Sequence, residues 1–549
     1  MIKIRNILNR FYHSFILPNY QVWIFILVFI SAECIVNPLR EFPLNDDWSY
    51  SKSVRILQFE HRFTIGDWPA MTLFTHVIWG FLFTKSFGYS LVVLRISGIC
   101  ASVIGSLILY SLVKKISGHK TFALCTALAV FLNPIYFNLS NTFMTDVSFT
   151  TVFIWCALLI YNFHQVQKPL TLLWIFIASS LLVLIRQFGI VVPFAFLLSC
   201  LFMKHKRWFY SLLALFCLAM VYGVFKYYEN YLAGILPEHA AYKFSNSIGL
   251  KNDAFMQVLF YNIEQRIKIL IVLVLTFVAP VLLIFLPGAF KASNKFVFFI
   301  VLILSFIFVN SFFREVPFPF RNIFMNMTVG YETFFQNAQS PVAHNHSDSF
   351  EKIMSMVKLI LSAISIAVSV LFFINKRSTG TETVNRLPFV IFILTFFVLY
   401  LFELFISESF FDRYALPLIV SLILAVVYFT SIYKPDFKFY FLLIPFFFYV
   451  SVFGTRDYFE WNTKKWEAYR YLRDENNIPS DKINAGFEVS CWNDGRESWW
   501  ANYLDLNGIN YLIQFKSENG FSPLKAYEFQ RYFPYKEDKI YIFVRDTIQ

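Results

Sequence analysis

Charged residues are scarce in this 549-residue chain: they make up 15% of it, whereas hydrophobic residues make up 57%. A soluble globular protein is about one quarter charged, so this composition excludes an ordinary soluble domain and indicates an integral membrane protein. Acidic residues are the scarcer kind, which leaves a formal net charge of +12. The basic residues fall in short loops between apolar segments, where the positive-inside rule explains them. We therefore do not expect nucleic acid as a partner.

Cysteine is nearly missing from the polar C-terminal part, where only Cys491 occurs among the seven cysteines of the chain. An internal disulfide is therefore excluded there, and the other six cysteines, in or beside apolar segments, are expected to behave as small hydrophobes. No Cys-x-x-Cys pair is present, which removes a common metal signature. The sequence also has neither a tandem repeat nor the inverted two-half symmetry of many transporters.

Long apolar runs are abundant, and about 20 such residues are needed to span a bilayer. The runs predict about 13 transmembrane helices in a polytopic α-helical membrane protein. They lie near 20–37, 90–113, 121–137, 147–164, 169–186, 188–203, 207–227, 266–287, 295–313, 355–374, 387–406, 414–432 and 438–454. Residues 70–86 are apolar too, but they carry His76 and Lys85, which favours a re-entrant or interfacial helix.

The distribution of charge predicts the orientation. Lys and Arg fill the N-terminus and the alternate loops, in which Glu382 and Asp436 are the only acidic residues. By the positive-inside rule these segments are cytoplasmic, and an odd number of spans then places the C-terminus outside. We expect a multi-pass protein of the cell (inner) membrane, with the loop 38–89 on the outer face.

The last part of the chain, 455–549, is far more polar than the rest. Residues 464–476 have the spacing of an amphipathic helix. Residues 483–492, 510–515 and 540–545 are rich in β-formers and predict strands. The sequence therefore predicts two parts: a transmembrane module over 1–454, and a small extracytoplasmic α/β domain over 455–549.

Two adjacent acidic residues, Asp46 and Asp47, follow the first apolar run. Carboxylates are costly at a membrane edge, so their presence there suggests a function, although a solvated acidic loop is the plainer explanation. Asp146 begins another span on the same side, where it could bind a substrate or cap the helix. Both alternatives stay open for these residues.

Two arginines lie at the same predicted depth as the acidic residues. Arg186 follows an apolar run, and Arg413 stands between Asp412 and Tyr414 near the outer end of another. A guanidinium offers two parallel donors to a phosphate, which would make these residues phosphate contacts. The plainer alternatives are an arginine that reaches towards the headgroups and a surface ion pair of Asp412 with Arg413.

Together these residues resemble the GT-C class of polytopic glycosyltransferases, in the bacterial branch related to dolichyl-phosphate-mannose protein mannosyltransferases and lipid A aminoarabinose transferase. The motifs that carry the resemblance span most of the chain in the same order. They are Asp46-Asp47, the Phe-Gly-Tyr-Ser-Leu-Val-Val-Leu-Arg run at 87–95, Met-Thr-Asp at 144–146, Leu-Ile-Arg-Gln-Phe-Gly at 184–189, Asp-Arg-Tyr-Ala-Leu-Pro at 412–417, and a tail pattern with Trp461, Trp466 and Trp492.

The resemblance implies an inverting transfer of a sugar, hexose or pentose, from a polyprenyl-phosphate donor to an acceptor on the outer face. It also implies that an aspartate of the first outer loop is the general base, which falls on Asp46 or Asp47, and we prefer Asp46. A lipid, a glycan and a protein all remain candidate acceptors, and membrane lipids surround the protein. The developing charge on the phosphate needs cations, for which Arg186 and Arg413 are candidates, with Asp146 and Tyr414 as further substrate contacts.

One motif departs from the family. Several relatives place a basic residue or His before Pro-Pro in the first outer loop, whereas this chain has Gly-Asp-Trp-Pro-Ala at 66–70. Phosphate binding must then come from elsewhere, or Asp67 recruits a cation. No cofactor is certain, and a divalent metal is left open. The alternatives to an enzyme are a membrane transporter or lipid flippase of the cell envelope and a scaffold without catalysis.

Overall fold

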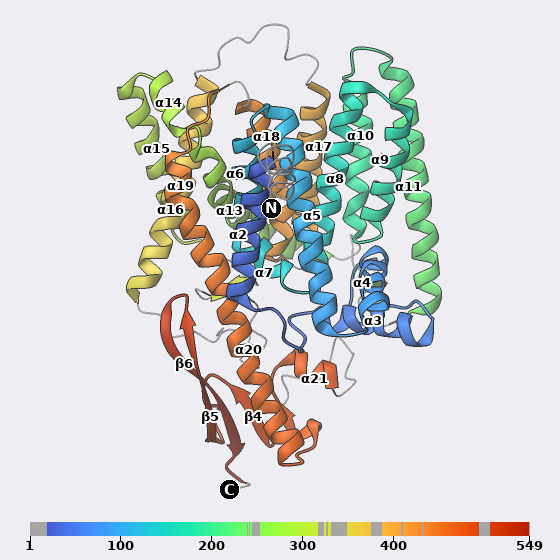
Figure 1. Cartoon of the computed structure of the whole chain (residues 1–549), viewed down its shortest axis with the longest axis vertical. Coiled ribbons are helices and arrows are strands. Elements are labelled where there is room, and N and C mark those ends of the chain that lie inside the picture. The colour runs from blue at the N-terminus through green and yellow to red at the C-terminus, as the bar shows by residue number, and fades with distance from the viewer. Residues whose placement is uncertain are drawn as a thin grey trace, which may run out of the picture.

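The computed structural model has two parts, a bundle of apolar helices and a small domain with a β-sheet at one end of it (Figure 1). It describes residues 19–238, 240, 242–243, 253–316, 323–325, 328–330, 348–374, 387–407, 410–430, 433–493 and 506–547. The long helix that begins at Lys438 leaves the bundle and ends at Glu475 inside the small domain, so the two parts share a continuous element.

An apolar helix or helix pair occupies each of the predicted transmembrane segments. The bundle comprises α2 (Tyr20–Val36), α5 (Leu91–Ser117), α6 (Lys120–Phe131), α7 (Pro134–Ser140), α8 (Thr145–Val166), α9 (Pro169–Val183), α10 (Val191–Cys200), α11 (Arg207–Ile235), α13 (Asp253–Leu283), α14 (Leu286–Ala292), α15 (Lys295–Phe313), α16 (Asp348–Ile374), α17 (Leu387–Ile406), α18 (Leu416–Thr430) and α19 (Lys438–Phe448). In the described part of the chain, nine helices are long and apolar enough to cross a membrane, or ten if the pair α6–α7, bent by 71°, is one span. Three shorter apolar helices, Tyr20–Val36, Pro169–Val183 and Gln187–Cys200, fill the remaining predicted segments.

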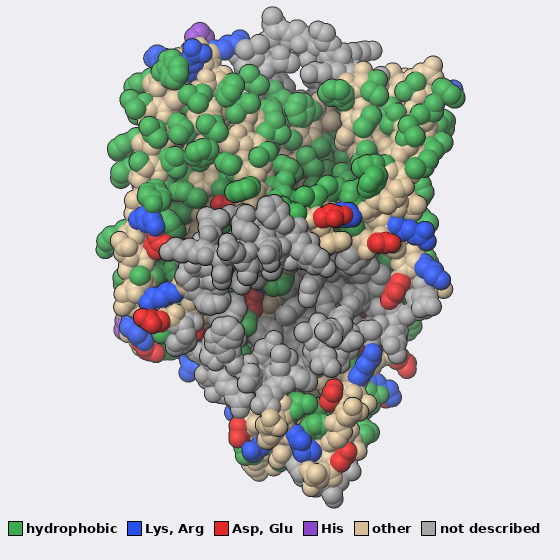
Figure 2. All heavy atoms as spheres, turned by 180° about the vertical axis from the view of Figure 1, so that it is seen from behind, with side chains coloured by type: hydrophobic (Ala, Val, Ile, Leu, Met, Phe, Trp, Pro, Cys, Tyr) green, Lys and Arg blue, Asp and Glu red, His purple; other side chains and the backbone are tan. Residues whose placement is uncertain are grey.

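Apolar side chains cover the outside of this bundle. Helix α15 is only 22% buried and α11 only 28%, although both are strongly apolar, whereas α8 is 72% buried. An apolar face that is not packed against protein is what a helix presents to lipid. On the face shown in Figure 2, hydrophobic side chains cover the middle of the bundle, and charged side chains lie at its two ends and on the small domain. The predicted class, a polytopic helical membrane protein, is confirmed.

Two short helices of the loop 38–89 lie beside the end of the bundle that faces the small domain (Figure 1). Helix α3 spans Asp47–Glu60, and α4 spans Phe74–Phe87, in the segment expected to form an interfacial helix. The loop between them is tied to the bundle, because Tyr228 Oη of α11 donates to Thr72 O at 2.6 Å. Arg95 of α5 is also buried and donates to the carbonyls of Pro38, Arg40 and Phe42, which fixes the start of the loop.

The small domain contains a four-stranded sheet in the order β3-β4-β6-β5. Strands β3 (Ile483–Asn484) and β4 (Tyr511–Gln514) are parallel, whereas β6 (Tyr535–Arg545) pairs antiparallel with both β4 and β5 (Phe521–Tyr532). Helix α20 (Gly454–Arg470) packs on β5, and the π-helical segment η7 (Tyr471–Glu475) continues it, so the helix predicted at 464–476 is confirmed.

The strand predicted over 483–492 is wrong beyond its first two residues. Gly486 has a φ of +93°, and its N–H donates to Asn484 Oδ1, which together turn the chain out of the sheet. The residues that follow form helix α21 (Phe487–Asn493), which packs against α3. Alternating apolar residues therefore predicted the wrong element here, because a local turn interrupts them.

Candidate functional site

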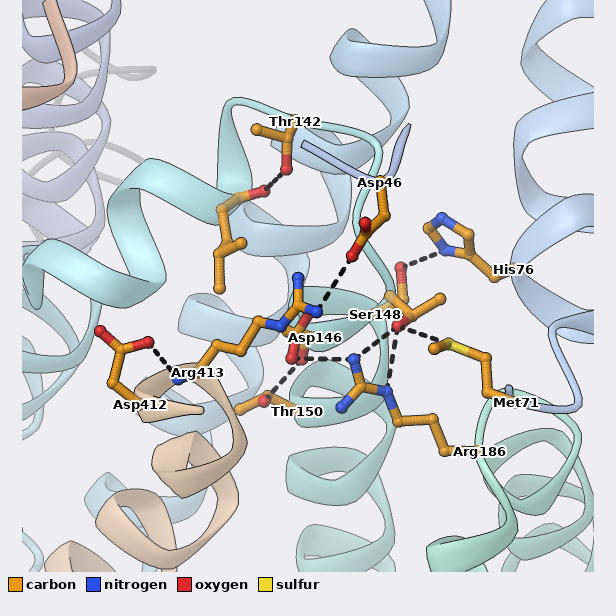
Figure 3. Close-up of polar contacts among 12 residues, drawn as sticks. Asp46, Met71, His76, Thr142, Asp146, Ser148, Thr150, Arg186, Asp412 and Arg413 are labelled. Atoms are coloured by element: carbon orange, nitrogen blue, oxygen red, sulfur yellow. Dashed lines mark hydrogen bonds and ion pairs between the residues drawn. The ribbon is translucent and has the colours of Figure 1, made fainter. Parts of the chain in front are cut away.

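Four segments that are far apart in the sequence meet at the end of the bundle, beside the loop 38–89 (Figure 3). They are the start of α3, the start of α8, the residues before the turn η3 (Gln187–Ile190), and the turn η5 (Asp412–Ala415) that precedes α18. Charged side chains from all four are buried here. Charge of both signs inside an apolar protein is costly unless the groups are paired or hydrogen-bonded, and each of these groups has such a partner.

Asp46 and Arg413 form the first pair. Arg413 Nη2 lies 3.0 Å from Asp46 Oδ2, and Trp68 Nε1 donates to Asp46 Oδ1, also at 3.0 Å. The carboxylate is thus held from two sides, by a cation and by an indole N–H. Asp46 is 9% exposed, so it remains the more accessible of the two adjacent aspartates.

The guanidinium of Arg413 has donors to spare. Its Nε and Nη1 are buried and, among the described residues, have no hydrogen-bond partner. The group lies over the rings of Phe411 and Tyr414, at 5.1 and 5.5 Å from their centroids, which fixes its plane. Buried donors without partners are uncommon in a folded protein. These donors are available to a negatively charged ligand.

Asp146 and Arg186 form the second pair. Arg186 Nη2 lies 2.8 Å from Asp146 Oδ1, and the same guanidinium donates to Thr145 Oγ1 through Nε and Nη2, at 3.0 and 2.7 Å. Met144, rather than Asp146, is the N-cap of α8, so capping does not explain the buried carboxylate. Arg186 also lies 5.3 Å from the ring of Tyr414, which therefore contacts both arginines of the site.

Asp47 has different surroundings from Asp46. Its Oδ1 accepts from the N–H of Leu44 at 2.6 Å, and its Oδ2 accepts from the N–H of Phe143 at 3.4 Å. It joins the loop 38–89 to the segment before α8. It is 3% exposed, and burial raises its pKa to about 7, although Arg95 favours the charged form. The two carboxylates therefore occupy different positions: Asp46 borders the arginine cluster, and Asp47 holds the backbone around it.

Asp412 does not form the surface ion pair that was one alternative for it. It is 1% exposed, and its carboxylate accepts from the N–H groups of Ile323, Phe324 and Arg413. Through these bonds it holds the short hairpin of β1 (Phe324–Met325) and β2 (Thr328–Val329) against the start of α18. Its place beside Arg413 in sequence thus serves to orient the turn that carries the arginine.

Sequence reasoning missed several polar residues of the cluster. Tyr50 is buried one helical turn after Asp46, within the electrostatic reach of both arginines and both paired aspartates, and its ring meets His76 edge to face at 6.2 Å. His76 Nδ1 is bonded to Ser148 Oγ at 3.0 Å, and burial lowers the pKa of His76 to about 4, so the ring is neutral. The spacing of four residues from Asp46 was a signal for Tyr50, because it places both on one side of a helix.

Asp67 lies between α3 and α4, partly exposed, and directly precedes Trp68, whose indole reaches Asp46. Its recruitment of a cation stays a prediction. Throughout the residues that the structure describes, no group of three or more His, Cys, Asp or Glu side chains could hold a metal ion. The cations that the described site offers a negatively charged ligand are Arg413 and Arg186.

Comparison with known proteins gives matches to solved structures over nearly the whole chain and to a family model over part of it. A structure of ArnT from Cupriavidus metallidurans in the apo state is 13% identical and has a TM-score of 0.43, with 96% of this chain and 98% of that chain covered. A structure of ArnT from Cupriavidus metallidurans bound to undecaprenyl phosphate is 12% identical with a TM-score of 0.41, over 95% and 98% of the two chains. No curated protein matches the chain in sequence.

A family model matches a part of the chain that contains one of the two ion pairs. The match covers residues 73–227, from α4 to α11, and so includes Asp146 and Arg186. Over these residues the chain is similar to the dolichyl-phosphate-mannose-protein mannosyltransferase family, as the sequence motifs predicted.

Proposed function

We propose that this protein is an integral-membrane glycosyltransferase that moves a sugar from a polyprenyl-phosphate donor to an acceptor hydroxyl, with inversion at the sugar carbon. The observation that carries the proposal is the pair of Asp46 and Arg413. A carboxylate that can take a proton lies beside a guanidinium whose Nε and Nη1 are buried and have no partner in the described part of the chain. A transfer from a phosphate to a hydroxyl needs both groups close together.

The chemistry balances with these residues alone. The acceptor oxygen attacks the sugar carbon, the bond from that carbon to the phosphate oxygen breaks, and the acceptor proton passes to Asp46. The polyprenyl phosphate leaves as an anion, so no second carboxylic acid is needed to protonate it. Arg413 and Arg186 stabilise the growing negative charge, and Tyr414 keeps the two guanidinium groups in place.

Binding of the donor changes the contacts of the proposed base. In the structure, Arg413 Nη2 lies 3.0 Å from Asp46 Oδ2. A donor phosphate that binds Arg413 competes with Asp46 for the guanidinium. Asp47 is less suited to be the base, because both of its oxygens already accept from backbone N–H groups.

The family match supports the donor class, since the family is named for a sugar carried on dolichyl phosphate. The proposal includes the cell (inner) membrane, a cytoplasmic N-terminus, a catalytic module over 1–454 and an extracytoplasmic domain over 455–549. The proposal includes a hexose or a pentose as the sugar, and a lipid, a glycan or a protein as the acceptor.

The test is a transfer assay with the purified protein in detergent. A panel of radiolabelled polyprenyl-phosphate sugars is offered together with envelope extract as acceptor, and wild type is compared with Asp46→Asn. Asp538→Asn, a carboxylate of the small domain, is the matched control. We expect label transfer with wild type and the control, and a loss of about 10²- to 10⁴-fold with Asp46→Asn. Full activity of Asp46→Asn refutes the base. No transfer by folded wild type from any donor favours the transporter or flippase.

A further inference from the structure

The small outer domain contacts the backbone of the first outer loop directly before Asp46. Glu488 of α21 is completely buried, and its Oε1 accepts from the N–H of Asn45 at 3.1 Å. Asn45 has a φ of +54°, a left-handed conformation that is uncommon for residues other than glycine, although asparagine adopts it more readily than most. Such a conformation persists where the surroundings determine it. The bond from Glu488 is one such determinant, and it comes from a residue 443 positions away in the chain.

Glu488 is itself held by a buried cation. Lys465 Nζ of α20 lies 2.9 Å from Glu488 Oε2, both side chains are fully buried, and the ammonium lies 5.1 Å from the centre of the Trp461 ring. A buried ion pair is seldom needed for stability alone, because well-packed apolar residues of similar size often serve as well. Its value here is directional: Lys465 holds one carboxylate oxygen so that the other faces Asn45.

A second set of contacts leads from α21, the helix of Glu488, to Asp46. Lys52 Nζ of α3 donates to Cys491 O of α21 at 2.7 Å, and Trp48 and Cys491 pack in a cluster with Trp68 and Trp492. Trp68 is the residue whose indole N–H binds Asp46. Helix α21 therefore supports both the backbone before Asp46 and the indole that orients its carboxylate.

We propose that Glu488, oriented by Lys465, is a positioning residue of the small outer domain that holds Asn45 and thereby Asp46 in the geometry for catalysis. The inference rests on the proposed function for its effect on transfer, and on the contacts alone for its effect on the loop. It assigns the outer domain a part in building the site.

Two double variants separate positioning from charge. Both carry Lys465→Met and so remove the ion pair. The Gln variant adds Glu488→Gln, which keeps an oxygen that can accept from Asn45 N–H. The Met variant adds Glu488→Met, which does not. We expect a kcat within about threefold of wild type for the Gln variant and a fall of about 10²-fold for the Met variant, since a small displacement of a catalytic group costs about that much. The KM for the donor should change little in either, because the arginines remain.

Arg531→Met with Asp538→Met is the matched control. It removes another ion pair of the outer domain, 2.7 Å between Nε and Oδ2, which joins β5 to β6, and its kcat should equal that of wild type. If the Met variant does not fold, Lys465→Glu with Glu488→Lys keeps the charges balanced while removing the acceptor at 488, and we expect the same loss. Equal activity of the Gln and Met variants overturns the proposal.

Hydrogen exchange gives a readout that does not need turnover. Amide exchange over residues 44–48 should accelerate in the Met variant and stay near wild type in the Gln variant and the control. If wild type transfers no sugar from any donor in the panel, the proposed function fails, and exchange still decides whether Glu488 holds the loop. Unchanged exchange in the folded Met variant overturns the positioning role.

Discussion

Asp46 and Arg413 are 367 residues apart in the chain, yet their side chains form a buried ion pair of 3.0 Å. The first belongs to the loop after the first apolar helix, and the second to the turn that begins α18. Their contact brings an acidic oxygen and two unpartnered guanidinium nitrogens to one place among the described residues. The ion pair of Asp146 with Arg186 lies beside it, and Tyr414 contacts both arginines.

Replacing Arg413 by Lys should weaken donor binding although the charge is kept. A lysine has no planar fork, so it cannot present two fixed donors to a phosphate. Hydrogen bonds to charged groups contribute about 1.5–3 kcal/mol, which predicts a Kd for polyprenyl phosphate about tenfold or more above wild type. Titration of the lipid in detergent, followed by tryptophan fluorescence, measures it. Arg531→Lys is the control, and an unaltered Kd for Arg413→Lys contradicts the phosphate role.

Arg186 should have separable effects on stability and on donor binding. Arg186→Ala leaves Asp146 buried without its cation, which we expect to cost about 3–5 kcal/mol of stability and to lower the Tm. Adding Asp146→Ala removes the stranded carboxylate, so the Tm should recover in large part. Donor affinity should stay low in the double variant because the guanidinium is still missing. Recovery of donor affinity together with the Tm would mean that Arg186 serves the fold alone.

The raised pKa of Asp47 predicts a pH dependence of stability. The folded protein holds a proton on Asp47 up to about pH 7, whereas an unfolded chain releases it near pH 4. Between these values the folded state binds more protons, so this residue's contribution to stability falls as the pH rises. The Tm of wild type should therefore fall relative to that of Asp47→Asn between pH 5 and pH 8. A difference in Tm that stays constant from pH 5 to pH 8 would mean that Asp47 does not titrate in this range in the folded protein.

The sequence identified most of the charged residues of the site but not their partners. Asp46, Asp47, Asp146, Arg186 and Arg413 stand out because charge is costly next to apolar runs. Their pairing depends on how helices far apart in the chain pack, which hydrophobic patterns do not specify. The separate surroundings of Asp46 and Asp47 likewise follow from the N–H of Phe143, in a distant segment.

Glu488 shows a different limit of sequence reasoning. It lay in a predicted strand, where alternation would have made it a solvent-facing residue. The turn at Gly486 instead starts α21 and directs Glu488 into the protein, against Asn45. The backbone conformation of one glycine thus decides whether this carboxylate lies on the surface or is buried. A pattern of alternating apolar residues does not reveal such a turn at a single residue.

Trp68 offers a test of how finely Asp46 must be oriented. Trp68→Phe keeps an aromatic ring among Trp48, Cys491 and Trp492 but removes the N–H that donates to Asp46 Oδ1 at 3.0 Å. A hydrogen bond to a charged group contributes about 1.5–3 kcal/mol, so a bond that holds the base in place predicts a kcat about 10- to 100-fold lower. Initial rates across donor concentrations separate kcat from KM, and KM should move little because the arginines are intact. Trp492→Phe, in the same cluster, controls for the loss of ring area and should keep nearly full kcat. If both variants lose the same activity, packing in this cluster matters and the bond to Asp46 does not.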